Sequence, residues 1–239
     1  MKLKKKKIKF KDLSFFYSDN SFTPTGTSAL LCDTIIKVIK DEKEILDFGC
    51  GIGVVGITLF KKKNIKKTLY ASDISKESIN LCKLNSLSHK VNVDARVGSL
   101  FTPWPNKKFD LIINDISGIS EKIANISPWF KKTSCESGID GTLLTSKVIT
   151  ESKKFLKKKG KIIFPIISLS DSKKILSEAK LNFRKVIKLS SQNWPMPKEF
   201  YKNKKVLFNL KKKKLIDFEE RFGILTFTTD IFLAKNYVK

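Results

Sequence analysis

Four glycines in eight positions separate an apolar strand-like run from an apolar helix-like run, and aspartates stand on both sides. The run "EILDFGCGIGVVGITLF", residues 44–60, begins like a buried strand, breaks at the glycines and resumes as a helix. A chain takes this form where its backbone must pass close to a ligand, because glycine has no Cβ to hold the ligand away. Phosphates, nicotinamide dinucleotides and S-adenosylmethionine are all bound at such turns, so the flanking residues must discriminate between them.

Two glycine patterns overlap at this turn. The later glycines satisfy G-x-G-x-x-G, the dinucleotide fingerprint, which also expects an acid about twenty residues further on, where Asp73 stands. The earlier glycines follow Asp47 in the pattern D-x-G-x-G-x-G, and they are Gly49, Gly51 and Gly53. Both patterns require a strand before the turn and a helix after it.

Asp47 favours a cofactor without phosphate. A dinucleotide places its pyrophosphate at the helix N-terminus, and a carboxylate two residues before the first glycine repels that anion. S-adenosylmethionine carries an ammonium, a carboxylate and a sulfonium. An acid at the strand end suits the cationic groups, while the N–H groups of the glycines face the carboxylate.

Asp73 closes the next strand-like run in "YASDIS" and suits the ribose that both cofactors share. Its carboxylate accepts hydrogen bonds from two ribose hydroxyls, and Ile74 beside it offers an apolar wall for adenine. Each acid also has a purely structural role open to it. Aspartate commonly caps helices, so the alternative is that Asp47 and Asp73 only cap the helices that follow them.

The elements that position these residues alternate along the chain. Strand-like and helix-like runs in succession predict an α/β fold: a Rossmann-like, seven-stranded, mostly parallel sheet with helices on both faces and an antiparallel C-terminal hairpin. Helices are expected at 28–40, 54–63, 75–88, 120–127, 142–160 (closed by Gly160) and 171–180, and strands at 44–48, 68–73, 91–99, 109–115, 161–167, 183–190, 204–210 and 224–234. Residues 1–22 are interpreted as a basic lead-in and residues 23–239 as one domain.

The net charge of +25 has two explanations. Lysine and arginine neutralise phosphate, so the charge is typical of a nucleic-acid surface. However, only Arg96, Arg184 and Arg221 are arginines, and the lysines are spread along the whole chain, which is also what a compositional bias produces. Both explanations stay open, and the sequence does not indicate the oligomeric state.

Cysteine and histidine content argues against a metal site. Cys32, Cys50, Cys82 and Cys135 form no C-x-x-C pair, and His89 is the single histidine. No run of about 18 apolar residues predicts a membrane span, and the N-terminus lacks the features of a secretory signal. We expect a cytoplasmic chain with reduced thiols, without a metal and without membrane insertion.

Together these segments resemble the class I S-adenosylmethionine-dependent methyltransferases, and in particular the branch that methylates release-factor glutamine and ribosomal protein L11. "ILDFGCGIGVVGI" is similar to the first motif of the family, "YASDIS" to its ribose-binding segment, and "FDLIIND" to its fourth-strand motif. The resemblance implies that "VGSLF" brings Ser99 and Leu100 near adenine, and that "FTPTGTSALL" brings Thr27 to the cofactor. It covers roughly residues 23–239.

The substrate motif departs from the family pattern. The amide- and amine-methylating branch reads Asn-Pro-Pro-Tyr at the end of the fourth strand, whereas this chain reads "NDIS". Asn114 matches and is expected to hold the acceptor group. Asp115 does not match, and it is our candidate for accepting a proton or orienting an N–H or O–H. Its alternative role is to cap the next segment or to pair with a lysine.

These observations predict an S-adenosylmethionine-dependent methyltransferase acting on a nitrogen or oxygen, on a protein or an RNA, with a small-molecule acceptor still open. A nicotinamide-binding oxidoreductase is the first alternative, although the chain lacks a hydride-transfer pair of the Tyr-x-x-x-Lys kind outside a basic loop. A catalytically silent protein that binds nucleic acid through its lysines is the second.

Overall fold

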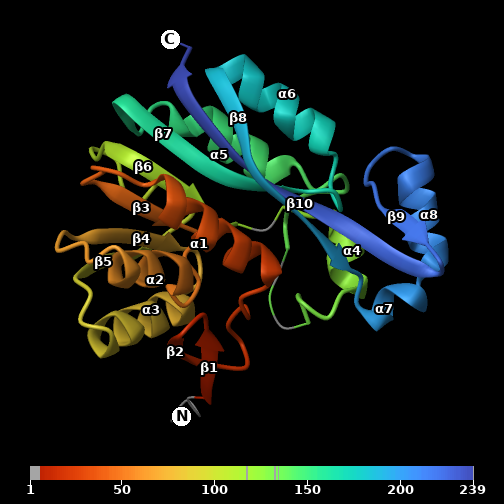
Figure 1. Cartoon of the computed structure of the whole chain (residues 1–239), viewed down its shortest axis with the longest axis horizontal. Helices are drawn as coiled ribbons and strands as arrows, with labels where there is room; N and C mark the ends of the chain where they lie inside the picture. Colours follow the sequence, from red (N-terminus) through yellow and green to blue (C-terminus); the bar gives the residue numbers. More distant parts are fainter. Residues whose placement is uncertain (1–5, 117, 132, 134, 239) are drawn as a thin grey trace. The chain divides into compact units, whose positions relative to one another are not determined.

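The computed structural model describes residues 6–116, 118–131, 133 and 135–238. In it, strands and helices alternate along much of the chain (Figure 1). Ser117, the last residue of the "NDIS" motif, and residues 1–5 of the predicted lead-in lie outside the described residues. The described residues divide into two units. The first comprises the residues up to Asp115 together with Lys154–Phe164, and the second comprises the remainder.

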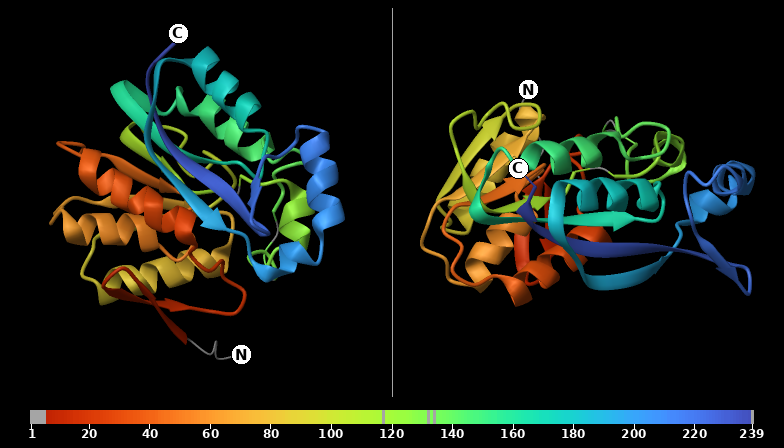
Figure 2. Two further views of the ribbon diagram at one scale, coloured as in Figure 1. Left: turned by 45° about the vertical axis from the view of Figure 1, so that its right-hand side comes forward. Right: turned by 90° about the horizontal axis from the view of Figure 1, so that it is seen from above.

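The first unit is built on a parallel sheet with the strand order β5-β4-β3-β6-β7, in which every neighbouring pair is parallel. Helices α1, α2 and α3 pack beside one another, and α2 and α3 pack on strands β3, β4 and β5 (Figures 1 and 2). An antiparallel hairpin, β1–β2, packs on α3. The elements are β1 (Lys6–Phe10), β2 (Leu13–Tyr17), α1 (Gly26–Val38), β3 (Ile45–Phe48), α2 (Val54–Lys62), β4 (Leu69–Asp73), α3 (Lys76–Ser88), β5 (Val93–Val97), β6 (Phe109–Asn114) and β7 (Leu156–Ile167), the last of which continues into the second unit.

The central strands of this unit are short and buried on both sides. All four residues of β3 are buried, as are five of the six in β6. Continuous apolar runs of this kind are typical of parallel strands covered on both faces. This burial holds the C-terminal ends of β3, β4 and β6 in fixed positions.

The second unit contains a long antiparallel pair. Strand β10 runs beside β8 with a register shift between Ile231 and Phe232, and its first residues pair with β9. Helix α6 packs on α5 and on β8. The elements are α4 (Glu121–Ile126), α5 (Leu143–Ser152), α6 (Ser172–Asn182), β8 (Phe183–Pro195), α7 (Lys198–Tyr201), α8 (Lys204–Lys212), β9 (Glu219–Arg221) and β10 (Ile224–Tyr237).

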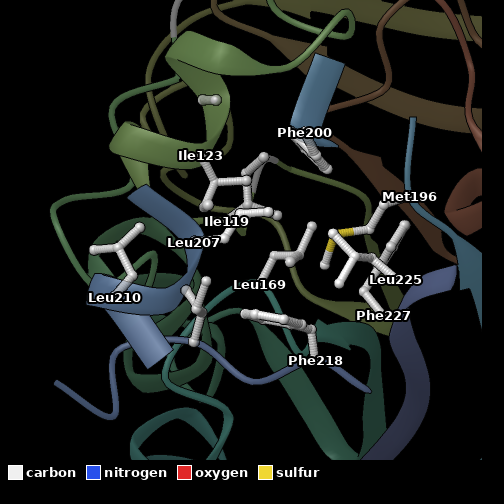
Figure 3. Packing of buried hydrophobic residues seen from close by; sticks show 12 residues of the cluster. Ile119, Ile123, Leu169, Met196, Phe200, Leu207, Leu210, Phe218, Leu225 and Phe227 are labelled. Atoms are coloured by element: carbon white, nitrogen blue, oxygen red, sulfur yellow. The ribbon is translucent and has the colours of Figure 1, made fainter. Parts of the chain in front are cut away.

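A separate apolar core holds α4, α7, α8 and the end of the β8–β10 pair together (Figure 3). Leu169, Leu207 and Leu225 are fully buried in it, with Phe200. The ring of Trp129 meets the ring of Phe200 edge to face at a centroid distance of 5.5 Å. Helices α7 and α8 are thus anchored on the inside by apolar side chains.

The long helix predicted at 142–160 is wrong in its second half. Helix α5 ends at Ser152, and Leu156 starts strand β7 opposite Phe109. The register shifts after this pair, so the lysines that follow are accommodated as an irregularity in the strand. A Cβ at Gly160 would lie 2.8 Å from the carbonyl oxygen of Phe109, so this glycine permits close approach of two strands and does not end a helix.

The strand predicted at 204–210 is also wrong, because this segment forms helix α8. Leu207 and Leu210, three residues apart, both point into the apolar core (Figure 3). In a strand these two side chains would face opposite sides. The short run "VLFNL" fits the hydrophobic period of a helix as well as that of a strand, and packing against the core selects the helix.

The predicted α/β fold is confirmed: the sheet is mostly parallel, helices surround it, and the C-terminal strands pair antiparallel. The predicted lead-in of residues 1–22 contains the β1–β2 hairpin. The division of the chain into a lead-in of residues 1–22 and one domain of residues 23–239 stays a prediction.

Candidate functional site

Four segments meet where the parallel strands of the first unit end. The N–H of Gly49 donates to the carbonyl of Ser72 at 2.9 Å, and the N–H of Gly98 donates to the carbonyl of Asp73 at 3.0 Å. The N–H of Asp115 donates to the carbonyl of Phe48 at 3.1 Å. The ends of β3, β4, β5 and β6 are therefore tied to one another, which is the edge where ligands bind in open α/β sheets.

The glycine turn needs its glycines for two different reasons. Gly53 is the N-cap of α2 with φ of 86°, and a Cβ there would lie 2.7 Å from Cδ1 of Ile57 and 2.8 Å from Sγ of Cys82. Gly51 has φ of 52°, but its Cβ would meet no atom within 4 Å. The backbone at Gly51 thus borders open space, while Gly53 is pressed between two helices.

Asp47 is fully buried in β3, and its two carboxylate oxygens differ in their hydrogen bonding. Oδ2 accepts the N–H of Gly56 at 2.9 Å, and Oδ1 has no hydrogen-bond partner among the described residues. Burial raises the pKa of Asp47 to about 7, and the charges of Asp115 and Asp73 act in the same direction. Asp47 therefore caps α2 with one oxygen only: its Oδ2 joins strand β3 to the first turn of the helix.

Asp73 closes β4 and holds the turn from the other side. Its Oδ2 accepts the N–H of Gly51 at 2.9 Å, and its Oδ1 accepts the N–H of Ser75 at 2.8 Å. Burial raises the pKa of Asp73. The side chain that caps α3 is that of Ser75, which accepts from Ser78, so Asp73 is not the N-cap that its sequence position allows. Ile74 leaves 72% of its surface exposed beside this carboxylate.

Asn114 and Asp115 stand at the end of β6. Asn114 is buried, and Asp115 is partly exposed and accepts the hydroxyl of Ser28. Burial raises the pKa of Asp115 to about 7. The contact with Ser28 brings the start of α1, and with it the buried Thr27, to this strand end.

The segment after β5 follows Asp73 closely. Ser99 is exposed, and its carbonyl accepts both the N–H and the hydroxyl of Thr102. Leu100 has φ of 50°, which is rare for a side chain of its size. The structure thus gathers all the predicted site residues within the first unit.

Asn85 was missed by the sequence reasoning. It lies fully buried in α3, where its amide donates to the carbonyls of Phe16 and Ile52 and its Oδ1 accepts the N–H of Phe16. One side chain therefore ties the glycine turn to the β1–β2 hairpin. A polar residue in "SINLCKLNSLS" at the helical spacing of the buried Ile79 and Cys82 was the available signal.

Three carboxylates thus surround one glycine turn without a basic partner. No lysine or arginine of the described residues forms an ion pair with Asp47, Asp73 or Asp115. The ordinary lowering of carboxyl pKa values by a cation is absent, and burial raises all three pKa values. Such an arrangement favours a ligand that brings its own positive charge and hydroxyl groups.

Comparison with known proteins agrees with this chemistry. The model of the family "Methyltransferase small domain" matches residues 7–115, which span every strand end described above. A release factor glutamine methyltransferase from Dictyoglomus turgidum is 31% identical over 180 residues, covering 69% of this chain and 60% of the relative. A ribosomal protein L11 methyltransferase from Thermoanaerobacter is 25% identical, covering 61% of this chain and 45% of the relative.

Solved structures show the same fold at low identity. A 16S rRNA N2 G1207 methyltransferase from T. thermophilus, in complex with AdoMet and guanosine, aligns with a TM-score of 0.60 and 11% identity over 99% of this chain and 51% of that one. A ribosomal protein L11 methylase from Lactobacillus delbrueckii subsp. bulgaricus aligns with a TM-score of 0.52 and 16% identity over 92% and 83%.

The chain spans only 53–60% of the length of the release factor methyltransferases it matches first. The comparisons support the predicted resemblance to methyltransferases and not the nicotinamide alternative. In the part of the chain that the structure describes, no helix is both long and apolar enough to cross a bilayer. The similarity to the methyltransferase small domain family extends over residues 7–115, which carry the glycine turn and its three aspartates.

Proposed function

We propose that this chain is an S-adenosylmethionine-dependent methyltransferase that acts on a nitrogen or oxygen atom of a protein or an RNA. The observation that carries the proposal is the cluster of Asp47, Asp73 and Asp115 around a glycine turn, uncompensated by any ion pair among the described residues. A dianionic pyrophosphate would add charge of the same sign to this cluster, whereas S-adenosylmethionine adds an ammonium and a sulfonium.

The residues at the turn fit this cofactor. Oδ1 of Asp47 is a buried acceptor with no donor among the residues that the structure describes, and the space beside Gly51 admits a ligand group against the backbone. Asp47 would attract the ammonium, and the N–H groups of the turn at Gly49, Gly51 and Gly53 would face the carboxylate. A ligand donor near Oδ1 would remove the energetic cost of leaving a buried acceptor unpaired.

The adenosine half would lie along the end of β4. Asp73 already accepts two backbone N–H groups, and each carboxylate oxygen retains a lone pair for a ribose hydroxyl. The exposed Ile74 would cover one face of adenine, and the segment at Ser99 and Leu100 would border its edge. Thr27 would approach the cofactor from the start of α1, next to the contact between Ser28 and Asp115.

The acceptor would be held at the end of β6. When bound, S-adenosylmethionine supplies an electrophilic methyl group on a sulfonium. Asn114 would orient the accepting group, and Asp115 would take or orient its proton. Because burial raises the pKa of Asp115 to about 7, this carboxyl changes protonation near neutral pH, where a general base is most effective. The cluster of carboxylates also favours the cationic reactant over competing anions.

A macromolecular acceptor in the cytoplasm is the finer part of the proposal. The relatives are named for proteins, a release factor and ribosomal protein L11, and the T. thermophilus enzyme is named for 16S rRNA. All four cysteines are free thiols, as a reducing compartment requires.

Titration calorimetry with S-adenosylhomocysteine and NADH tests the cofactor. We expect S-adenosylhomocysteine to bind, NADH not to bind, and Asp73→Ala to lose at least tenfold in affinity, about 1.4 kcal/mol, because hydrogen bonds to a charged group contribute about 1.5–3 kcal/mol. Asp12→Ala removes an exposed carboxylate of the same charge and serves as the control. NADH binding, or no effect of Asp73→Ala, would contradict the proposal.

Methyl transfer from labelled cofactor into cell lysate tests the acceptor. After separation into protein, RNA and small-molecule fractions, we expect label in protein or RNA, and none with Asp115→Ala. Label in small molecules alone would refute the macromolecular acceptor while leaving the cofactor assignment intact.

A further inference from the structure

One stretch of the second unit is rich in lysine. Residues 198–214 hold eight lysines in 17 positions, against 45 lysines in all 239 residues. These positions form α7, α8 and the turn after α8.

Six of these lysines are exposed and form no ion pair to a described carboxylate. Lys204 and Lys211 are paired, with Glu220 and Asp217, and Arg221 pairs with Glu219. The nearby acids on β9 and before it are therefore already taken. The six lysines that remain are Lys198, Lys202, Lys205, Lys212, Lys213 and Lys214.

Two exposed aromatic rings lie among these lysines. Phe208 projects from α8 between Lys205 and Lys212, at the spacing of one helix face, with 45% of its surface exposed. Phe222 is fully exposed at the β9–β10 turn, with φ of 50°. The pair between Lys204 and Glu220 joins the first turn of α8 to β9, the strand that leads into Phe222.

The β9–β10 turn gives Phe222 no packing role. Gly223 follows with φ of 77°, and a turn of two left-handed residues ordinarily takes Asn, Asp or Gly at both positions. A phenylalanine there adds apolar surface that nothing in the described fold covers. Together with the lysines it forms what we name the α8 surface: the six lysines above with Phe208 and Phe222.

We propose that the α8 surface binds single-stranded RNA. Lysines that contact the phosphates, with aromatic rings on which bases stack, are the combination that proteins use to bind single strands without reading their sequence. Lysine lacks the planar fork with which arginine reads bases, so this surface suits sequence-tolerant binding. The inference that this RNA is the methyl acceptor, or carries it, rests on the proposed function. The binding itself does not.

An anionic membrane is the competing ligand for a basic amphipathic helix. Such a helix inserts its apolar face into the lipid. In α8 that face is already occupied, because Leu207 and Leu210 are buried in the apolar core of the unit, which also contains Phe200 and Phe218 (Figure 3). Only the lysine face with its single ring is left, which favours RNA.

Fluorescence anisotropy of the full chain with a labelled 20-nucleotide single-stranded RNA tests the proposal. Replacing Lys205, Lys212 and Lys213 by Gln is expected to weaken binding at least tenfold at about 100 mM salt. The slope of log K against log salt concentration should fall by about 2, for three lost phosphate contacts on a single strand. Phe222→Ala should weaken binding about fivefold or more without changing this slope.

A matched triple variant controls for total charge. Lys63→Gln, Lys66→Gln and Lys67→Gln remove the same charge from exposed lysines of the first unit. We expect less than a twofold effect from this variant. An equal loss in both triple variants, no RNA binding at all, or binding to phosphatidylserine vesicles in place of RNA overturns the proposal.

Calorimetry with S-adenosylhomocysteine on the same variants separates the two proposals. Its affinity should not change, since the substituted side chains lie on exposed positions of α8, the turn after it and the β9–β10 turn. RNA binding by a protein that does not bind S-adenosylhomocysteine would refute the proposed function and leave the α8 surface standing. The reverse result would refute only the α8 surface.

Discussion

Around the glycine turn of the first unit the side chains are held by the fold, whereas on the α8 surface of the second unit they project into solvent. The polar side-chain groups of Asn85 and Asp73 each form hydrogen bonds with two or more backbone groups, and Asp47 lies fully buried. On the α8 surface six lysines have no described ion pair, and Phe222 is fully exposed.

This difference indicates two kinds of recognition. A turn shaped by buried contacts presents backbone groups in one geometry, which suits a small ligand with many polar atoms. A surface of exposed lysines and rings adapts to a long, flexible anion, where charge matters more than shape. Mutations at the glycine turn should therefore lower the stability of the fold, whereas mutations on the α8 surface should weaken RNA binding and leave the stability almost unchanged.

The largest expected effect is on stability at Gly53. Gly53→Ala combines left-handed strain of about 1–2 kcal/mol with overpacking against Ile57 and Cys82 of about 1–3 kcal/mol. Gly223→Ala, also at positive φ but with no atom within 4 Å of its Cβ, should cost only the strain. Chemical denaturation measures both, and equal losses would show that the glycine turn is no more tightly packed than the β9–β10 turn.

Asn85→Ala should follow, with a loss of about 2–4 kcal/mol. The change leaves the N–H and carbonyl of Phe16 and the carbonyl of Ile52 without their partner. Asn209→Ala, on the exposed side of α8, should change the unfolding free energy by about 0.5 kcal/mol or less. Hydrogen exchange should show faster exchange of the Phe16 amide in Asn85→Ala, and unchanged protection would contradict the assigned role.

The pH dependence of stability comes next. The folded pKa of Asp47, about 7, lies above its ordinary value of 3.8, so its contribution is most favourable below pH 4 and is lost as the pH rises through 7. In Asp47→Asn the side-chain oxygen can still accept the N–H of Gly56, but the side chain at position 47 no longer titrates. The difference in melting temperature between Asp47→Asn and the unsubstituted protein should therefore grow in favour of Asp47→Asn from pH 5 to pH 8. A constant difference would show that Asp47 does not titrate in this range.

The smallest effect is expected at Phe222. Phe222→Ser should change the unfolding free energy by about 0.5 kcal/mol or less, because the ring is fully exposed. Thermal melting measures this directly. A loss above about 1 kcal/mol would mean that the ring supports the fold, and the contrast between the two regions would then narrow.

Most of the first unit could be predicted from sequence because its signals are local. The D-x-G-x-G-x-G pattern follows a buried strand and precedes a helix, and Asp73 ends the next strand, as expected. These features need only short segments, since hydrophobic periodicity and glycine content report on the few residues around them. The fold class and the positions of the acids followed directly.

The errors arose where distant contacts choose between local alternatives. Residues 153–160 carry a helix-like pattern, but strand β7 begins at Leu156, which pairs with Phe109. Residues 204–210 fit a strand, but the core of the second unit takes Leu207 and Leu210 from one side of a helix. Intrinsic propensity is weak enough for packing to override it.

By itself, the sequence determined that a glycine turn flanked by aspartates would stand at a strand end, because residue type and spacing are sufficient for that. Only the tertiary structure decided that Asn85 would join this turn to Phe16, 69 positions away, and that Lys204 would pair with Glu220 and so join α8 to β9. The physical reason is that spacing along the chain sets local backbone form, whereas hydrogen bonds and packing between distant segments form only when the core brings them together.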